Sequence, residues 1–239
     1  MSISSKFPLA AAAGAILLGT AALGLLPATV HADSAARLLP PPALDTPPAT
    51  PGPQTAVFAG GCFWGVQGVF QRVKGVTQAV SGYAGGTVAS PGYEQVSSGS
   101  TGHAESVQVT FDPAQVSYAT LLQVFFSVAL DPTQVDRQGP DRGTQYRSEL
   151  FVNGPDQEKI ARAYIAQLTA AHVYSKPIAT RIDQAGKFYP AEAYHQDYLL
   201  SHLDSPYIAI NDIPKVQNLQ QLFPGLWRTQ PVLVSKPNG

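Results

Sequence analysis

The stretch that decides the fold runs Ala56-Val57-Phe58-Ala59-Gly60-Gly61-Cys62-Phe63-Trp64-Gly65. Its first four residues form a short apolar run that ends at a glycine pair, which predicts a buried strand followed by a turn. Apolar side chains then recur at helical spacing over residues 62–72, so the sequence predicts a helix there. We therefore expect Cys62, the only cysteine of the chain, at the positive end of a helix dipole.

The rest of the chain alternates between strand and helix patterns. Further strands are predicted over residues 76–83, 105–111, 148–152 and 178–182, and further helices over residues 117–128, 155–171 and 191–202. The stretch that follows the strand predicted over residues 76–83, through residue 102, is rich in Gly and Ser and is expected to be a loop. The polar segment 131–142 is also expected to be a loop. This interleaving indicates an α+β fold, a two-layer α/β sandwich in which helices cover one sheet.

Composition and charge exclude one class of partner. The 239 residues carry a net charge of -1, and only 13% of them are charged. Such a chain offers no basic surface to neutralise phosphates, so we expect no nucleic-acid partner. No residues stand at a spacing that would ligate a metal, and we expect none.

The two ends of the chain differ from its middle. Residues 1–32 hold a cation, a long apolar stretch and Val30-His31-Ala32, which predicts a signal peptide cut after Ala32. The alternative is a retained membrane anchor facing the same compartment, because the apolar stretch approaches the length that spans a bilayer. In either case we expect an exported protein, periplasmic or secreted. Residues 33–53 are predicted to be a Pro-rich linker outside the core, residues 54–210 one folded domain, and residues 211–239 a C-terminal tail.

A lone cysteine in an exported protein cannot form an intramolecular disulfide, so Cys62 needs another explanation. One explanation is a small buried hydrophobe. The other is a reactive thiol, because a helix N-terminus stabilises a thiolate and makes it nucleophilic near neutral pH. Phe63 and Trp64 can likewise be core residues, or an apolar wall that holds a methyl group beside the sulfur.

At these residues the sequence resembles a known family, the A-class peptide methionine sulfoxide reductases, over about residues 56–198. The matching segments, in the family's order, are Gly61-Cys62-Phe63-Trp64-Gly65, Gly82-Tyr83 with Gly85-Gly86, Tyr93-Glu94-Gln95-Val96, Gly102-His103-Ala104-Glu105, Gln138-Gly139 with Asp141, Gly143-Thr144-Gln145-Tyr146, Arg147-Ser148, and Ala191-Glu192-Ala193-Tyr194-His195-Gln196-Asp197-Tyr198.

The resemblance implies a ferredoxin-like core and reduction of methionine S-sulfoxide, free or in proteins, without a cofactor. In an exported protein this activity would repair oxidative damage. The residues that the resemblance assigns to the site are Cys62 as nucleophile, Glu105 as acid, Tyr93, Asp141 and Tyr146 as further catalytic groups, and Phe63 and Trp64 as the methyl pocket.

The chemistry of the reaction supports these assignments independently. Sulfoxide oxygen leaves only when it is protonated, so a thiolate that attacks the sulfur needs an acid beside the oxygen. A glutamate in an apolar pocket, as expected for Glu105, keeps its proton at neutral pH. The phenols of Tyr93 and Tyr146 would bind the same oxygen. Outside such a site Glu105 would be a surface charge, the two tyrosines rim residues and Asp141 a turn residue.

The sequence departs from the family's pattern in two places. The family often carries resolving cysteines in its C-terminal tail, and this tail has none. A sulfenic acid on Cys62 would therefore need an external thiol, either a thioredoxin-like protein or a small thiol, and we expect the protein to act as a monomer. Leu130 stands where the family usually has histidine, which puts a contact of the following loop in doubt.

Three other functions compete with the reductase. A cysteine hydrolase would pair Cys62 with His195 or His103, whereas we expect both histidines to be structural. A thiol peroxidase would also form a sulfenic acid but would leave Phe63 and Trp64 without a purpose. A noncatalytic domain that binds oxidised or apolar peptides would show no turnover.

Overall fold

The computed structural model describes residues 1–2, 36–45 and 52–234, so most of the predicted signal peptide lies outside the described residues. The strands are β1 (Gln54–Gly60), β2 (Val76–Ala84), β3 (Ala104–Phe111), β4 (Arg137–Gln138), β5 (Asp141–Arg142), β6 (Ser148–Val152), β7 (Arg181–Gln184) and β8 (Tyr189–Pro190). The α-helices are α1 (Phe63–Phe70), α2 (Tyr93–Ser97), α3 (Tyr118–Val124), α4 (Pro155–Ala170), α5 (Tyr198–Ser201) and α6 (Ile213–Leu222). Shorter turns of helix are the π-helices η1 (Phe125–Ala129) and η4 (Ile208–Asp212) and the 3-10 helices η2 (Thr144–Tyr146) and η3 (Ala193–His195).

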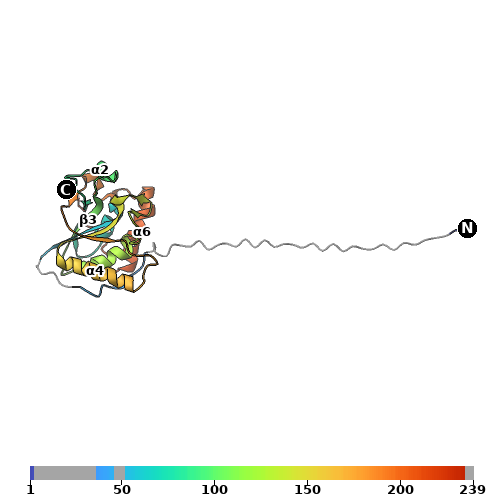
Figure 1. Ribbon diagram of the computed structural model, residues 1–239, viewed down its shortest axis with the longest axis horizontal. Coiled ribbons are helices and arrows are strands. Elements are labelled where there is room, and N and C mark those ends of the chain that lie inside the picture. Colours follow the sequence, from blue (N-terminus) through green and yellow to red (C-terminus); the bar gives the residue numbers. More distant parts are fainter. Residues whose placement is uncertain (3–35, 46–51, 235–239) are drawn as a thin grey trace. The chain divides into compact units, whose positions relative to one another are not determined.

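One six-stranded sheet organises the domain, in the order β7-β6-β1-β3-β2-β8. Only β6 and β7 are parallel, and every other neighbouring pair is antiparallel. Along the chain α1 follows β1 and α3 follows β3, so the central order β6-β1-β3-β2 is the ferredoxin-like arrangement. Figure 1 shows α4 running along one side of this sheet. The predicted α+β sandwich with a ferredoxin-like core is confirmed.

Both faces of β1 are buried, which explains its uninterrupted apolar run. Ala56 and Phe58 join the main core with side chains of α1, α3 and α4, and Phe58 stacks on Phe70 with ring centroids 4.7 Å apart. Val57 and Ala59 join a smaller cluster on the opposite face. Burying a side chain as large as Phe58 stabilises a fold by about 2 kcal/mol.

The turn after β1 is built by glycine. Gly61 has a φ of +88°, which L side chains rarely adopt, and a Cβ there would collide with the side chain of Gln138. Cys62 follows as the N-cap residue of α1 and makes no side-chain capping hydrogen bond. The predicted strand, turn and helix around Cys62 are all present.

Most other predicted elements are present with shifted limits. The strand predicted over residues 178–182 lies later, as β7. The helix predicted over residues 117–128 is capped by Ser117 as expected, because its side chain accepts from the amide of Thr120. It then continues as η1, whose five residues are all buried. The two predicted loops also contain structure that their composition hid, α2 in the first and the β4–β5 ladder in the second.

The helix predicted over residues 191–202 is wrong. The chain forms η3 and α5 instead, separated by Asp197, whose φ is +56°. The break is held by α1: the amide of Asp197 donates to Gln67 Oε1 at 2.9 Å, and Gln71 Nε2 donates to Asp197 Oδ1 at 2.6 Å. Buried glutamine side chains need partners, and the broken helix supplies them.

Part of the predicted linker belongs to the core. Leu39 is 2% exposed and lies in the main cluster. Its amide donates to Ser127 Oγ at 3.2 Å, and the carbonyl oxygen of Pro40 accepts from the hydroxyl of Tyr164 at 2.9 Å. Proline removes backbone donors but leaves the carbonyls, so this stretch is held by the buried side chain and amide of Leu39 together with the carbonyl oxygen of Pro40.

The predicted domain boundary after Ile210 is also wrong, because it falls inside η4. The following helix α6 contacts α1, and its Leu219 is fully buried in the main core. Residues 207–222, called here the C-terminal segment, are therefore part of the folded domain. No helix among the described residues combines the length and the apolar character that a membrane span requires.

Candidate active site

Cys62 and Glu105 lie next to each other although they are far apart in sequence. Cys62 is 7% exposed and Glu105, on β3, is 2% exposed. Glu105 Oε2 accepts a hydrogen bond of 3.0 Å from the amide of Phe63, the residue after the cysteine. The pairing of β1 with β3 therefore brings a buried carboxyl group to the first turn of α1, as the sequence predicts.

The environment of Glu105 favours its protonated form. Burial is the main cause, and it raises the pKa of Glu105 to about 8. The hydrogen bond from Phe63 opposes this rise, and the negative charges of Asp141 and Asp212 add to it. A carboxyl group with this pKa holds its proton at neutral pH and can donate it.

The thiol of Cys62 is shifted in the opposite sense to the prediction from the helix dipole. Burial raises the pKa of Cys62 well above its ordinary value, and the charges of Glu105 and Asp212 raise it further. The amide of Trp64 and the ammonium group of Lys215 lower it by less. The resting form of Cys62 is therefore the thiol, and the expectation of a stabilised thiolate in the free protein is wrong. Burial outweighs the hydrogen bond that the amide of Trp64 offers at the helix N-terminus.

Phe63 and Trp64 join a cluster of rings beside the sulfur. Phe63 is buried and Trp64 half-buried, with their ring centroids 6.4 Å apart. Trp64 stacks on Tyr198 at 3.8 Å, and its indole nitrogen donates to His195 Nδ1 at 3.2 Å. The ring of Tyr93 lies 4.5 Å from that of His195. Phe63 and Trp64, the two predicted pocket residues, thus pack in the core and also belong to this cluster of rings.

The phenols of Tyr93 and Tyr146 face the same groups. Burial raises the pKa of both, and in each case the charges of Glu105 and Cys62 contribute, so both tyrosines keep their protons. Glu192 fixes Tyr93, since its Oε1 accepts from the amide of Tyr93 at 2.8 Å. Both phenols are hydrogen-bond donors available to an oxygen placed near Cys62.

Asp141 lies at a small cavity that reaches the sulfur. The cavity has a volume of about 80 Å³ and is lined by Cys62, Gln138, Gly139, Pro140, Asp141, Tyr207, Asn211 and Lys215. Asp141 Oδ2 accepts a hydrogen bond from the hydroxyl of Tyr207. Each site residue predicted from the sequence therefore lies near Cys62 or near a group that interacts with Cys62.

The sequence analysis missed three residues of this site, namely Tyr207, Asp212 and Lys215. All three come from the C-terminal segment. Asp212 is fully buried and pairs with Lys215, with 3.1 Å between Oδ1 and Nζ. An acidic residue shortly before Pro214 is a helix-start signal, which indicates α6 but says nothing of the site.

Both candidate histidines are structural, as expected. His195 Nδ1 accepts from Trp64, and burial lowers the pKa of His195, so the ring is neutral. His103 Nδ1 accepts from the amide of Gly86 at 3.1 Å, and its Nε2 lies 2.8 Å from the carbonyl oxygen of Val88. The hydrogen-bond partners of the two rings are Trp64, Gly86 and Val88, and no hydrogen bond among the described residues joins either ring to Cys62.

The loop after Leu130 is held without a histidine. Gln138 closes it, since its Oε1 accepts from the amide of Asp131 and its Nε2 donates to the carbonyl of the same residue. The side chain of Asp131 accepts from Thr133 and Gln134. The departure at Leu130 therefore leaves the loop ordered by other contacts.

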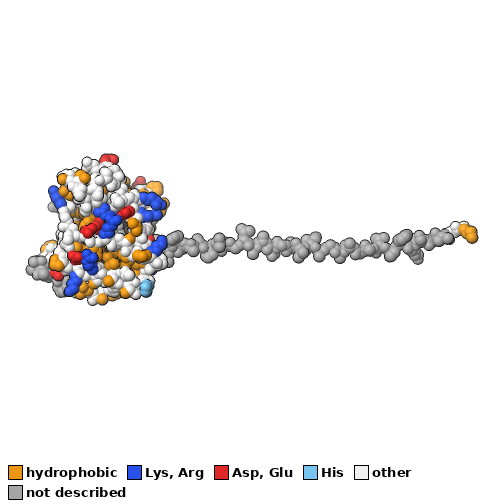
Figure 2. All heavy atoms as spheres, viewed as in Figure 1, with side chains coloured by type: hydrophobic (Ala, Val, Ile, Leu, Met, Phe, Trp, Pro, Cys, Tyr) orange, Lys and Arg blue, Asp and Glu red, His pale blue; other side chains and the backbone are white. Residues whose placement is uncertain are grey.

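The surface and the charge clusters add little to this site. On the face seen in Figure 2, cationic and anionic side chains lie close together, in keeping with a net charge of -1. Within the described part of the chain, no group of three or more His, Cys, Asp or Glu residues is arranged to hold a metal ion.

Comparisons with known proteins identify the family of this chain. The family model described as "Peptide methionine sulfoxide reductase" matches residues 54–225. A relative from Mesorhizobium japonicum, peptide methionine sulfoxide reductase MsrA 2, is 59% identical over 186 residues, covering 78% of this chain and 95% of its own. A relative from Thermus thermophilus, peptide methionine sulfoxide reductase MsrA, is 46% identical over 175 residues, covering 73% of this chain and 98% of its own.

A solved structure shows the same fold. Methionine sulfoxide reductase A of Corynebacterium diphtheriae superimposes with a TM-score of 0.55 and 34% identity, covering 70% of this chain and 87% of its own. The family match begins at the first residue of β1 and includes all of the C-terminal segment. The chain therefore belongs to the peptide methionine sulfoxide reductase family.

Proposed function

We propose that this protein reduces methionine S-sulfoxide, free or in proteins, by attack of Cys62 on the sulfoxide sulfur with Glu105 as the proton donor. The observation that carries the proposal is the position of Glu105. It is a fully buried carboxyl group with a pKa raised to about 8, hydrogen-bonded to the amide that follows the cysteine.

The reaction balances with these two groups. The sulfur of Cys62 forms a bond to the sulfoxide sulfur while the oxygen takes the proton of Glu105. Transfer of the oxygen to the cysteine then yields methionine and Cys62 sulfenic acid, so the substrate sulfur is reduced by two electrons and the cysteine sulfur is oxidised by two. The proton that the Cys62 thiol loses restores the carboxyl group of Glu105.

Substrate binding must promote the loss of the thiol proton, because Cys62 of the free protein holds that proton. The partial positive charge of a sulfoxide sulfur, placed against Cys62, favours the thiolate. The phenols of Tyr93 and Tyr146 are suited to hold the oxygen, and the rings of Phe63 and Trp64 to receive the methyl group, at about 0.8 kcal/mol for the buried carbon.

An external reductant is required to return Cys62 to its thiol. One thiol attacks the sulfenic acid, which gives a mixed disulfide and water, and a second thiol attacks the external sulfur and releases Cys62. The chain has no second cysteine to do this. A thioredoxin-like protein and a small dithiol both supply the chemistry, and the reaction of the protein alone is expected to stop after one equivalent of methionine.

We also propose that the protein works outside the cytoplasm, periplasmic or secreted, where it repairs oxidised methionine in exported proteins. The support is the sequence of residues 1–32. Cell fractionation of the full chain tests this, and recovery of the uncut protein in the cytoplasm would contradict it.

The reaction is tested with separate S and R epimers of a methionine sulfoxide peptide, dithiothreitol and the purified protein. We expect turnover of the S epimer alone, one equivalent of methionine without dithiothreitol, and loss of activity in Cys62→Ser. Equal turnover of both epimers, or activity that survives in Cys62→Ser, would overturn the proposal. Consumption of hydrogen peroxide at a comparable rate would favour a peroxidase instead.

A further inference from the structure

An ion pair in the C-terminal segment lies in an unusually buried position. Asp212 is fully buried at the junction of η4 and α6, and only 18% of the Lys215 side chain is exposed. Asp212 Oδ1 accepts from Lys215 Nζ at 3.1 Å, while Oδ2 has no hydrogen-bond partner. Taking charges out of water is costly in free energy, so a pair with an incomplete set of hydrogen bonds is a poor choice for stability alone.

The pair lies directly against the helix that begins at Cys62. Gly65, in the first turn of α1, leaves the space that the pair fills. A Cβ at Gly65 would collide with Asp212 Oδ1 and lie 2.9 Å from Lys215 Nζ. On its other side Lys215 lines the same small cavity as Cys62. The ammonium group is therefore a cation of a cavity that Cys62 also lines.

Negative charge on Cys62 needs such a cation. The charged and titratable side chains that face the sulfur, from every element around it, are Tyr93, Glu105, Asp141, Tyr146, Tyr207, Asp212 and Lys215. Lys215 is the only member of this set that carries positive charge. Burial, Glu105 and Asp212 raise the pKa of Cys62, and Lys215 lowers it.

We propose that Lys215, held in place by Asp212, is a positioning residue that stabilises the anionic form of Cys62. The inference rests on the proposed function, in which that anion arises twice. It forms when the thiol attacks the sulfoxide, and it leaves again when a second external thiol breaks the mixed disulfide. The negative charge of Asp212, taken by itself, disfavours the anion of Cys62. The role of Asp212 is therefore to fix the ammonium group of Lys215 at the cavity.

The test measures the anion directly, without sulfoxide or reductant. Iodoacetamide alkylates only the thiolate, so the rate of Cys62 alkylation against pH reports its ionisation. In Lys215→Met we expect roughly tenfold slower alkylation at pH 7.5 and a pH profile displaced to higher pH, because one cation is lost and Asp212 is left unopposed. Lys215→Arg keeps the cation and should stay within about threefold of the original rate.

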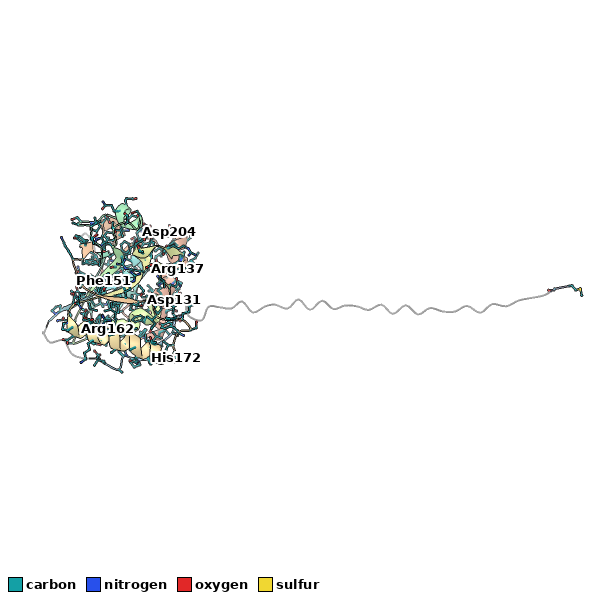
Figure 3. The ribbon with its side chains drawn as sticks, in the orientation of Figure 1. Asp131, Arg137, Phe151, Arg162, His172 and Asp204 are labelled. Carbon is teal, nitrogen blue, oxygen red and sulfur yellow. The ribbon has the colours of Figure 1, made fainter. Side chains whose placement is uncertain are left out.

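Two controls separate this effect from a loss of structure. The double variant Asp212→Asn with Lys215→Met leaves no unpaired buried charge, and its alkylation should be faster than that of Lys215→Met. Lys159→Met removes an exposed lysine of α4 and should leave the alkylation rate unchanged. In Figure 3, Arg162 of the same helix is labelled apart from Arg137.

The outcomes are distinguishable from those that test the proposed function. An unchanged profile in Lys215→Met, or an arginine variant as slow as the methionine variant, overturns the role of Lys215 whether or not the protein reduces sulfoxides. A double variant no faster than Lys215→Met overturns the role of Asp212. Should the protein fail to reduce sulfoxide while Cys62 alkylation responds as expected, only the proposed function is contradicted.

Discussion

Cys62 lies between two regions that are built differently. On one side, β1, α1 and β3 supply the sulfur and the buried acid, and strand pairing fixes both. On the other side, the C-terminal segment supplies Tyr207, Asp212 and Lys215 through contacts with α1 and the loop that holds Asp141. The first region carries the groups whose bonds change, and the second carries charges that act on them. Removing a side-chain group should therefore have a larger effect on the reaction rate or the stability in the first region than in the second.

The largest effect is expected at Glu105. Because Glu105 is the proposed proton donor, Glu105→Gln should slow single-turnover methionine formation by roughly 10²–10³-fold. The rate of the unaltered protein should fall as pH rises through about 8, where Glu105 loses its proton, and the variant should lack this fall. Quenched-flow measurement of methionine across pH tests both statements. An unchanged single-turnover rate would remove Glu105 from the mechanism.

The same substitution should change stability with pH. The pKa of Glu105 is about 8 in the folded protein against an ordinary value of 4.5, so the folded state keeps a proton that the unfolded chain releases. Its contribution to stability is complete below about pH 4.5 and is lost as pH rises through 8. Between pH 5 and 9 the free energy of unfolding should fall more steeply than in Glu105→Gln, by on the order of 1–3 kcal/mol. Urea unfolding at several pH values measures this, and parallel curves would contradict it.

Contact between the two regions is tested at Gly65. Gly65→Ala adds a Cβ where Asp212 and Lys215 lie, so the C-terminal segment must shift. We expect a loss of about 1–3 kcal/mol in the free energy of unfolding, although alanine is the better helix former. In the control Gly186→Ala nothing lies within 4 Å of the new Cβ, and stability should change by less than about 0.5 kcal/mol. Equal stability of the two variants would show that the regions are not tightly packed.

The smallest effect is expected at Tyr207. Tyr207→Phe removes the hydrogen bond to Asp141 but keeps the ring, which lies edge-on to Trp64. The expected loss is about 1 kcal/mol of stability, with only a few-fold change in the rate constant for sulfoxide reduction. A loss as large as that of Glu105→Gln would place Tyr207 among the reacting groups and erase the contrast between the two regions.

Sequence reasoning succeeded where the signal is local. The apolar run before Gly60, the helical spacing after Cys62 and the proline that begins α4 each describe a few consecutive residues, and the structure follows them closely. The strand predicted over residues 148–152 has the observed limits. The positions of Glu105, Tyr93 and Tyr146 came instead from the resemblance, because no periodicity shows that they face one sulfur.

Where prediction failed, a side chain that is far away in sequence determines the backbone conformation. Residues 191–202 have helical spacing, yet Gln67 and Gln71 of α1 bind Asp197 and break the helix. The C-terminal segment has mixed composition, and only its packing on Gly65 shows that it belongs to the site. Burial reversed the expected pKa shift of Cys62 for a related reason, since the solvent exposure of a thiol cannot be read from its neighbours in sequence.

The anchoring of Leu39 limits the distance between the domain and any membrane. The chain is already held two residues earlier, where the amide of Arg37 donates to the carbonyl oxygen of Ser127 at 3.2 Å. If the leader is retained, a fully extended chain from Ala32 to Leu39 reaches no more than about 25 Å. A domain on a retained anchor would therefore act only in a thin layer beside the bilayer. The cut form would instead diffuse to its substrates.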